Sequence, residues 1–339
     1  MKRTLLVDGN SLLKTGFHGI KNMYNGEAHI GGLFHFLKTL AYVIETNLIT
    51  KTIVFWDGKD NSSFRRKIYP QYKENRRKSY KTEEELQSFY RQKFRVQEYL
   101  EELYVRQGDF KKCEADDMIA HYCHTSKDEE IIILTLDRDL LQLINDKTSV
   151  LIQSMNTIFK KGDLVPLNGC SIISENVRLV KAVCGDSSDN ISGIKLVGVK
   201  SLIKLVPEIQ TKKIDLNYII ERIKNKDKIN KRERNILDGV TKNGILGSDA
   251  INKNLKIISM GKEFLTSEAK KGIIEINKES LDPKGRHWKN ALNLMMSDGI
   301  LNILPKANDS WVDFIKPFLR LSRIEKDFYK NTKIKKNEI

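Results

Sequence analysis

Short aliphatic and β-branched runs alternate with longer segments of helical periodicity along the first half of the chain. The runs predict buried strands at residues 4–7, 52–56 and 131–136, a short strand at 103–106 and an edge strand at 150–153. Apolar positions at helical spacing predict helices at 33–46 and 83–103. Strands that alternate with helices form βαβ units. We therefore expect an α/β fold with a mostly parallel central sheet flanked by helices.

The pattern changes near residue 173. Helical segments at 174–184 and 198–206 are joined by a turn-rich stretch that contains several glycines, and 211–235 is again helical in pattern. Beyond residue 262, Trp288, Trp311, Phe314 and Phe318 predict a packed helical cap, followed by a frayed basic tail from Lys326. We therefore expect an α/β domain at 1–173, a helical subdomain at 174–262 and a helical extension at 263–339.

Composition narrows the class of partner. The hydrophobic content of 40% is enough for a real core, and the formal charge of +15 favours a polyanion, with nucleic acid ahead of a membrane. The first apolar run is too short for a signal peptide and none reaches membrane-spanning length, so we expect a cytoplasmic protein without a membrane partner. The four cysteines show no CxxC pair, which is typical of reduced thiols. The spacing of Cys113, His121, Cys123 and His124 matches no standard zinc site.

Acidic residues follow three of the predicted strands. Asp8, Asp57 and Asp137 each stand at a carboxyl end, where parallel sheets form their sites. A lone Asp after a strand is usually a turn residue, but three strands that end in the same way would bring their acids to one edge of the sheet.

More acids lie near the start of a predicted helix and in two later turns. Glu114, Asp116 and Asp117 are close enough to repel one another; solvated helix-capping residues are the alternative to a cation site. Asp139 follows Asp137, and the turn-rich stretch holds a further pair that could instead simply form turns. No imidazole or thiolate accompanies these acids, so the set suits two Mg²⁺ or Mn²⁺ ions. The candidate metal ligands are Asp8, Asp57, Glu114, Asp116, Asp117, Asp137, Asp139, Asp186 and Asp189.

Residues 59–81 combine basic and aromatic side chains. Bases can stack on the aromatic rings while Lys and Arg neutralise phosphates, although a solvated basic helix face would look similar. Lys73 or Arg76 could offset charge on a reacting phosphate. Two metals can activate a water and stabilise the leaving oxygen, so the residues indicate a two-metal phosphodiesterase that acts on nucleic acid.

These residues resemble a known family, the flap endonucleases or 5′→3′ exonucleases of the phage and bacterial type, which have a PIN-like fold. The resemblance runs from Leu5 to about residue 206, and more weakly to about 260. It rests on six short motifs in the right order: Asp8-Gly9-Asn10, Phe55-Trp56-Asp57, Tyr72-Lys73-Glu74-Asn75-Arg76, Glu114-Ala115-Asp116-Asp117, Asp137-Arg138-Asp139 and Gly185-Asp186-Ser187-Ser188-Asp189-Asn190.

The resemblance implies a role for each group of residues. Asp8, Asp57, Glu114 and Asp116 would serve the first metal, and Asp137, Asp139, Asp186 and Asp189 the second, with Asp117 between them or behind them. Lys73 and Arg76 would contact the reacting phosphate from a helical arch at about 59–103, through which a 5′ single strand threads. Residues 192–200 would form a helix–three-turn–helix element that grips duplex DNA, often with a bound K⁺. The DNA-binding residues would be Arg65, Arg66, Tyr72, Arg77, Gly193, Gly198 and Lys200.

The resemblance also implies a substrate and a setting. The protein would be a monomeric hydrolase that processes 5′ flaps and RNA–DNA primers in replication, similar to free-standing phage enzymes, including those called RNase H. One departure concerns the predicted DNA-binding turn, where the family usually has Gly and this chain has Leu196, which bears on the K⁺ site. A catalytically silent DNA-binding protein and a PIN-like ribonuclease are the alternatives, and the intact acids and the long basic segment argue against them.

Overall fold

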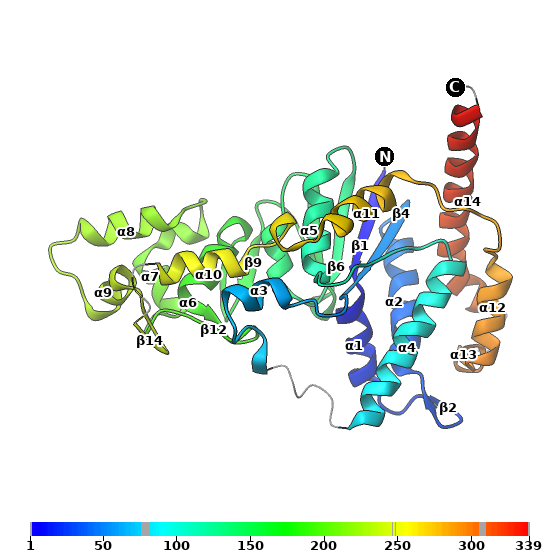
Figure 1. Ribbon diagram of the computed structural model, residues 1–339, viewed down its shortest axis with the longest axis horizontal. Helices are drawn as coiled ribbons and strands as arrows, with labels where there is room; N and C mark the ends of the chain where they lie inside the picture. The colour runs from blue at the N-terminus through cyan, green and yellow to red at the C-terminus, as the bar shows by residue number, and fades with distance from the viewer. Residues whose placement is uncertain (1, 76–81, 246, 248, 305–309, 338–339) are drawn as a thin grey trace.

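A twisted sheet of six strands forms the centre of the protein, in the order β5-β4-β1-β6-β7-β8. The computed structural model describes residues 2–75, 82–245, 247, 249–304 and 310–337. The first five strands in this order run parallel and β8 is antiparallel to β7, which confirms the predicted α/β fold (Figure 1). The strands are β1 (Arg3–Asp8), β4 (Lys51–Trp56), β5 (Arg106–Asp109), β6 (Glu130–Thr135), β7 (Thr148–Ile152) and β8 (Thr157–Phe159).

Alternate residues of the central strands face two different cores. Leu5 and Val7 of β1 pack into one core, while Leu6 between them packs into the other. Because helices cover both faces of the sheet, both sets of side chains are apolar, and the strands read as continuous hydrophobic runs. This arrangement explains why β1, β4 and β6 were evident in the sequence.

Helices from distant parts of the chain cover the two faces. One core is closed by α1 (Gly9–Gly19), α2 (Gly31–Thr46) and α4 (Glu83–Glu102), and the other by α5 (Ala115–Thr125) and α11 (Ser267–Lys278). The extension supplies α12 (Trp288–Ser297), α13 (Ile300–Ile303) and α14 (Ser310–Asn337), which pack beside α2 and α4. Phe314 and Phe318 enter that core, as predicted, whereas Trp311 is exposed and stacks on the ring of Trp288.

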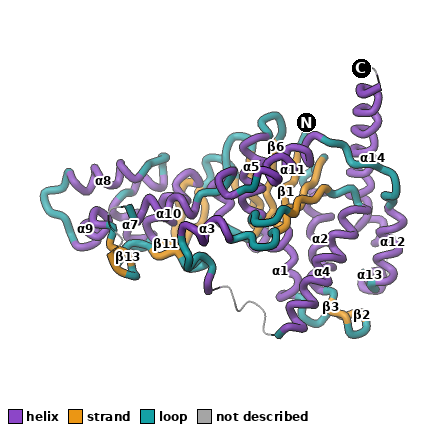
Figure 2. The backbone as a smooth tube through the Cα atoms, viewed as in Figure 1, coloured by secondary structure: helices purple, strands orange, loops and turns teal. Residues whose placement is uncertain are grey.

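A mainly helical unit lies beyond the β7 side of the sheet, at the left of Figure 2. It contains α6 (Val177–Cys184), α7 (Val199–Leu205), α8 (Leu216–Lys224), α9 (Lys231–Asp238) and α10 (Ala250–Ile258). Two small hairpins interrupt the helices, β11 (Gly185–Asp186) with β12 (Ile191–Ser192) and β13 (Val240–Thr241) with β14 (Gly244–Ile245).

Shorter elements complete the described part of the chain. The remaining strands, α-helix and short 3₁₀ helices (labelled η) are β2 (Tyr24–Asn25), β3 (Ala28–His29), α3 (Ser63–Ile68), η2 (Arg138–Leu143), η3 (Gln153–Met155), β9 (Leu164–Leu167), β10 (Cys170–Ile173), η4 (Ser174–Asn176), η5 (Pro207–Gln210) and η6 (Lys262–Phe264). No helix within the described ranges is both long and apolar enough to span a lipid bilayer.

Three predicted elements differ from the structure. The strand expected at 103–106 begins only at Arg106, because α4 runs to Glu102 and Tyr104 turns the chain with a φ of +58°. The strand near residue 150 is internal, since β8 pairs with its outer side. The tail from Lys326 is helical as far as Asn337. A buried ion pair between Glu325 and Arg106 fastens this last helix to the edge of the sheet.

Candidate metal centre and nucleic-acid interface

The carboxyl ends of the parallel strands bring the first acids together. Asp8 ends β1 and caps α1, accepting a hydrogen bond from the Ser11 N–H at 3.0 Å. Asp57 follows β4 and accepts the Ala115 N–H, at the start of α5, at 3.0 Å. Asp137 follows β6 and caps the turn η2. Each acid thus joins a strand end to a helix start, which orients its carboxylate along one edge of the sheet.

The charges of these acids act on one another. Burial, together with the charges of Asp57 and Asp137, raises the pKa of Asp8 to about 7. Burial and the charges of Asp8 and Asp137 also hold the pKa of Asp116 well above its usual range. Crowded carboxylates of this kind lower their energy by sharing a cation. Asp137, which the resemblance assigned to the second metal, therefore lies within electrostatic reach of the first group.

A second group of acids lies beside the first. Asp139, Asp186 and Asp189 are buried, and each offers an oxygen within 4.8 Å of those of the other two, as a metal site requires. Asp186 accepts hydrogen bonds from the backbone N–H and the hydroxyl of Ser188 at 2.9 and 2.6 Å. All the donor atoms are oxygens, so both groups fit hard divalent ions such as Mg²⁺ or Mn²⁺.

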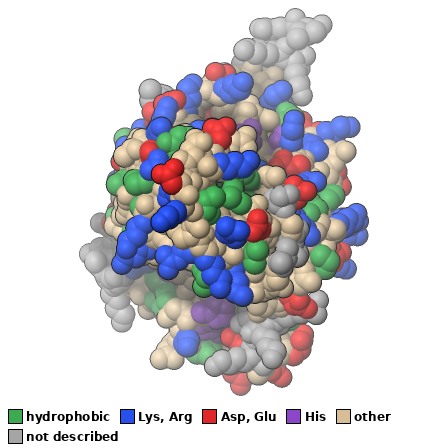
Figure 3. All heavy atoms as spheres, turned by 90° about the vertical axis from the view of Figure 1, so that its left-hand side faces the viewer, with side chains coloured by type: hydrophobic (Ala, Val, Ile, Leu, Met, Phe, Trp, Pro, Cys, Tyr) green, Lys and Arg blue, Asp and Glu red, His purple; other side chains and the backbone are tan. Residues whose placement is uncertain are grey.

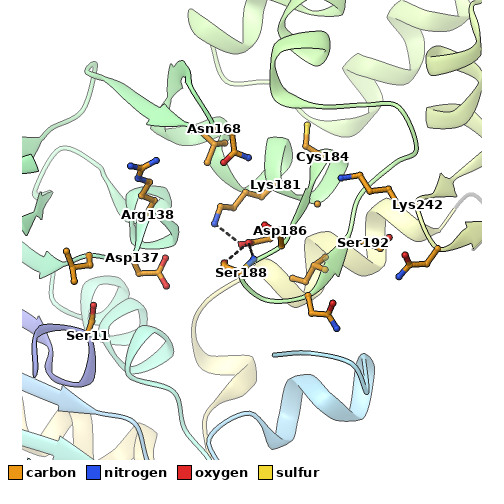
Figure 4. Close-up of a pocket in the computed structure, with 17 residues that line it drawn as sticks. Ser11, Asp137, Arg138, Asn168, Lys181, Cys184, Asp186, Ser188, Ser192 and Lys242 are labelled. Carbon is orange, nitrogen blue, oxygen red and sulfur yellow. Dashed lines mark hydrogen bonds and ion pairs between the residues drawn. The ribbon is translucent and has the colours of Figure 1, made fainter. Parts of the chain in front are cut away.

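Lys181 is a functional residue that the sequence reasoning missed. Its ammonium lies between Asp139 and Asp186, 2.8 Å from an oxygen of Asp186 (Figure 4). Burial acts to raise the pKa of Asp186, but Lys181 and Ser188 bring it below its usual range. Lys181 belongs to α6, which otherwise reads as an apolar helix before the acidic turn. A lysine on the buried face of that helix is the signal that could have revealed it.

Glu114 lies at the centre of a network of cations. Its carboxylate accepts hydrogen bonds from Lys73 at 3.0 Å, from Arg65 at 2.8 Å and from the Tyr72 hydroxyl at 3.2 Å. Burial acts to raise its pKa, but Lys73 and Arg65 outweigh burial and lower the pKa to about 2. Glu114 is therefore ionised, and it holds the ammonium of Lys73 near the acids.

Arg65, Tyr72 and Asp117 lie in one buried network of hydrogen bonds around Glu114. The Arg65 guanidinium is buried and bonds to both oxygens of Asp117, at 2.6 and 2.8 Å. The backbone N–H of Gly261 also donates to Asp117, so this acid faces its partner arginine rather than a metal. Tyr72 is buried against Glu114. A DNA phosphate would have to displace these partners. We therefore propose that Arg65 and Tyr72 position Glu114, and that Asp117 compensates for the charge of Arg65.

The basic segment is held against the turn at 185–190 by hydrogen bonds to backbone carbonyls. The Lys73 N–H donates to the carbonyl of Asp189 at 3.0 Å, and Lys73 itself has a φ of +55°. The side chain of Asn75 donates to the Ser187 carbonyl and that of Asn190 to the Gln71 carbonyl, each at 2.8 Å. Arg66 is exposed, as a DNA contact requires. Arg76 and Arg77 lie outside the described residues.

The two glycines of the predicted DNA-binding turn have different surroundings. A Cβ on Gly193 would come within 2.0 Å of the Cys184 backbone, so close packing demands glycine there. A Cβ on Gly198 would meet open space, and this residue starts α7 with Lys200 exposed beside it. Leu196 has a φ of +66°. Leu196 therefore adopts the left-handed conformation that a glycine would supply.

The end of the molecule formed by α7, α8 and α9 is rich in exposed cations. Figure 3 looks at this end and shows Lys and Arg side chains spread across it, with acids between them. A surface of this kind attracts the phosphates of nucleic acid without selecting a sequence. The exposed cations of these helices and their loops are Lys200, Lys204, Lys212, Lys213, Lys224, Lys226, Lys228, Lys231, Arg232 and Arg234.

A pocket of about 660 Å³ lies between the end of β6 and the helical unit, and Asp137 and Asp186 are among its lining residues (Figure 4). One side is formed by the start of α1 and by η2, and the other by β11, β12 and the β13–β14 hairpin. Its lining includes Ser11, Asp137, Arg138, Asn168, Lys181, Cys184, Asp186, Ser188, Asn190, Ser192, Lys242 and Asn243.

The chain is similar in sequence to known proteins. Residues 3–166 match the family described as "5'-3' exonuclease, N-terminal resolvase-like domain". A 5′-3′ exonuclease of Bacillus subtilis is 32% identical over 219 residues, which cover 62% of this chain and 71% of that protein. A 5′-3′ exonuclease of Buchnera aphidicola is 28% identical over 222 residues, covering 64% and 74%.

Solved structures support the same fold. The 5′-exonuclease of phage T5, in a structure with bound zinc, has a TM-score of 0.63 at 22% identity, covering 81% of this chain and 99% of that one. The T5 D15 flap endonuclease, in a complex with DNA and metal ions, has a TM-score of 0.57 at 18% identity, covering 88% and 100%.

The mostly parallel sheet with acids at its strand ends, and a second buried group of acids that includes the β11–β12 hairpin, matches the fold of these nucleases. The chain belongs to the 5′-3′ exonuclease family, and it is a phosphodiester hydrolase of the 5′ nuclease type.

Proposed function

We propose that this protein is a structure-specific 5′ nuclease that uses two Mg²⁺ or Mn²⁺ ions to hydrolyse phosphodiesters near the 5′ end of flapped or nicked DNA and of RNA–DNA primers. The observation that carries the proposal is the presence of two groups of buried carboxylates, one in which Asp8, Asp116 and Asp137 act on one another and one made by Asp139, Asp186 and Asp189. The T5 D15 flap endonuclease, which shares the fold, was solved with both DNA and metal ions, in agreement with this substrate.

Each acid group has a place in the proposed reaction. Asp8, Asp57, Asp116 and Asp137 would hold one ion, with Glu114 beside them, and Asp139, Asp186 and Asp189 would hold the other. When bound, such ions supply an activated water and neutralise the charge that develops on the leaving oxygen. The raised pKa of Asp8 means that ion binding also removes a proton from the pocket near neutral pH.

The cations of the chain position the substrate. Lys73, held by Glu114, would contact the non-bridging oxygens of the reacting phosphate, and Arg66 would contact the strand that enters beneath the basic segment. Lys181 would exchange its carboxylate partners for the phosphate as the ions load. The exposed cations of α7, α8 and α9 would follow the duplex backbone, which makes binding independent of sequence and dependent on salt.

The turn around Leu196 would bind K⁺ together with the duplex. The left-handed φ of Leu196 keeps the backbone in the conformation that glycine takes in the family, which supports the proposal that the turn keeps its ion-binding shape. We also propose that the chain acts as a monomer, since one copy contains both acid groups and the basic end.

A cleavage assay tests the proposed function. A 5′-labelled flap duplex incubated with Mg²⁺ should be cut near the junction, EDTA should abolish cutting, and Asp137→Asn should lower the rate by at least about 1000-fold. Protein that binds the flap but cuts nothing with Mg²⁺ or Mn²⁺ would be a silent DNA-binding protein. Faster cutting of single-stranded RNA than of the flap would instead indicate a ribonuclease.

A further inference from the structure

The β13–β14 hairpin is fastened to the predicted DNA-binding turn by its backbone. The N–H of Lys242 donates to the Gly193 carbonyl at 3.0 Å, and the N–H of Lys195 donates to the Val240 carbonyl at 2.8 Å. Thr241 also forms a bridge with Ile194. The position of this hairpin therefore depends on main-chain bonds, and the side chain of Lys242 is not needed to hold it.

Lys242 lines the same pocket as Asp137 and Asp186. Figure 4 shows it on the wall opposite Asp137 and Arg138, with its ammonium directed toward Cys184 at the end of α6. Lys242 is exposed, and no acid within the described ranges forms an ion pair with it. Lys181, the other lysine of the pocket, is by contrast already paired with Asp186.

An anion in this pocket would need such a cation. The lining includes Asp137 and Asp186, which repel phosphate wherever metal ions do not cover them. It also includes Lys242 and Asn243 of the β13–β14 hairpin, whose ammonium and amide can bond to phosphate and sugar oxygens. A strand that crosses the acids can therefore continue along this hairpin.

We propose that Lys242 binds a backbone phosphate of the DNA strand that leaves the acids toward the helical unit, which makes the β13–β14 hairpin a part of the DNA-binding surface. This proposal rests on the proposed function. The contact is with the unreacted strand, away from the cut bond, so Lys242 is a positioning residue that strengthens substrate binding and sets where the strand lies over the acids.

Equilibrium binding in EDTA tests the contact without any cleavage. The affinity for a 5′-flap duplex should be measured between 50 and 200 mM salt for the wild type, Lys242→Ala, Lys242→Arg and the control Lys284→Ala. One lost phosphate contact lowers the salt slope by about 0.9, so over this range the wild type should lose about 3.5-fold more affinity than Lys242→Ala. Lys242→Arg and Lys284→Ala, an exposed lysine of the extension, should keep the wild-type slope.

Replacing one phosphate at a time with a neutral methylphosphonate identifies the partner. At a single position, the neutral linkage should weaken the wild type and have no further effect on Lys242→Ala. An unchanged salt slope for Lys242→Ala, or additive effects at every position, would overturn the proposal, provided that thermal unfolding matches the wild type. Cleavage with Mg²⁺ is measured separately, so a protein that fails to cut can still confirm or refute this contact.

Discussion

The ammonium of Lys181 lies 2.8 Å from a carboxylate oxygen of Asp186 and also pairs with Asp139, so that it stands among the acids proposed to hold the second metal. Before a metal binds, this lysine is the cation that compensates for the buried charge of the group. A metal must therefore compete with a cation that belongs to the protein itself, and metal loading and the position of Lys181 are linked.

Removing the ammonium of Lys181 should lower the stability of the metal-free protein and increase the stability that it gains when a metal binds. Lys181→Met leaves buried acids uncompensated, so we expect the free energy of unfolding in EDTA to fall by about 3 kcal/mol. Mg²⁺ should recover more stability in this variant than in the wild type, because the site is no longer shared. Thermal unfolding with EDTA and with Mg²⁺ measures both effects. Lys161→Met, at an exposed ion pair with Asp146, should leave stability nearly unchanged. Equal changes in the two variants would contradict the linkage.

Arg65 should contribute to stability and Arg66 to DNA binding. Arg65→Met leaves Glu114 and Asp117 buried without their main partner, and we expect it to destabilise the fold by about 3–5 kcal/mol in urea unfolding. Arg66→Met removes an exposed cation, so unfolding should change by less than about 1 kcal/mol while the affinity for a flap duplex falls. A folded Arg65→Met protein of normal stability and weakened DNA binding would restore the role predicted from the sequence.

Lys73 should matter more for the reaction than for binding. Its ammonium is held 3.0 Å from Glu114 and its charge acts on Asp116, so it lies near the proposed first metal, and Lys73→Ala should lower kcat by about 100-fold. The affinity in EDTA should fall only a few-fold, as for the exposed neighbour Lys67→Ala. Equal losses in kcat and affinity would show that Lys73 only anchors the strand.

Leu196 should carry a small backbone strain. It has a φ of +66° and its side chain is 53% exposed, so little packing offsets the cost of the left-handed conformation. We expect Leu196→Gly to increase stability by about 0.5–1 kcal/mol, and Leu196→Ala, which keeps a Cβ, to have almost no effect. Chemical unfolding measures the difference. A loss of stability in Leu196→Gly would show that the leucine side chain makes contacts that matter in the folded protein.

Glu129 should make stability depend on pH at the edge of the sheet opposite the acids. Burial acts to raise its pKa, but hydrogen bonds from Thr4 and Tyr122 and the charge of Lys51 lower it below the ordinary 4.5. A lowered pKa stabilises the fold above pH 4.5, and this contribution is lost as the pH falls through the folded-state value.

Glu129→Gln should therefore unfold about 2 kcal/mol more easily at pH 7. The difference from the wild type should shrink in urea titrations below pH 4.5. Glu130→Gln, whose half-exposed side chain pairs with Arg3 at the surface, should differ little from the wild type at any pH. A difference for Glu129→Gln that stays constant down to pH 3 would rule out this carboxylate as the source.

Several site residues were predictable because a local pattern marks them. Asp8, Asp57 and Asp137 could be placed at one edge of the sheet because each follows a run of buried strand residues, and parallel strands end together. The cap at Trp288, Phe314 and Phe318 was predictable for a similar reason, since large apolar residues must pack somewhere. The β13–β14 hairpin was not predicted, because its strands of two residues are too short to show periodicity.

The sequence by itself determined the parallel sheet, the order of the acidic motifs and the basic excess, because these follow from side-chain periodicity and composition. Only the tertiary structure decided which charges meet. Arg65 and Lys181 look like any other basic residues in the chain, yet one is buried against Glu114 and Asp117 and the other against Asp139 and Asp186. Burial and pairing depend on residues far apart in sequence. The low dielectric of the assembled interior then strengthens the attraction between each buried cation and its buried acids.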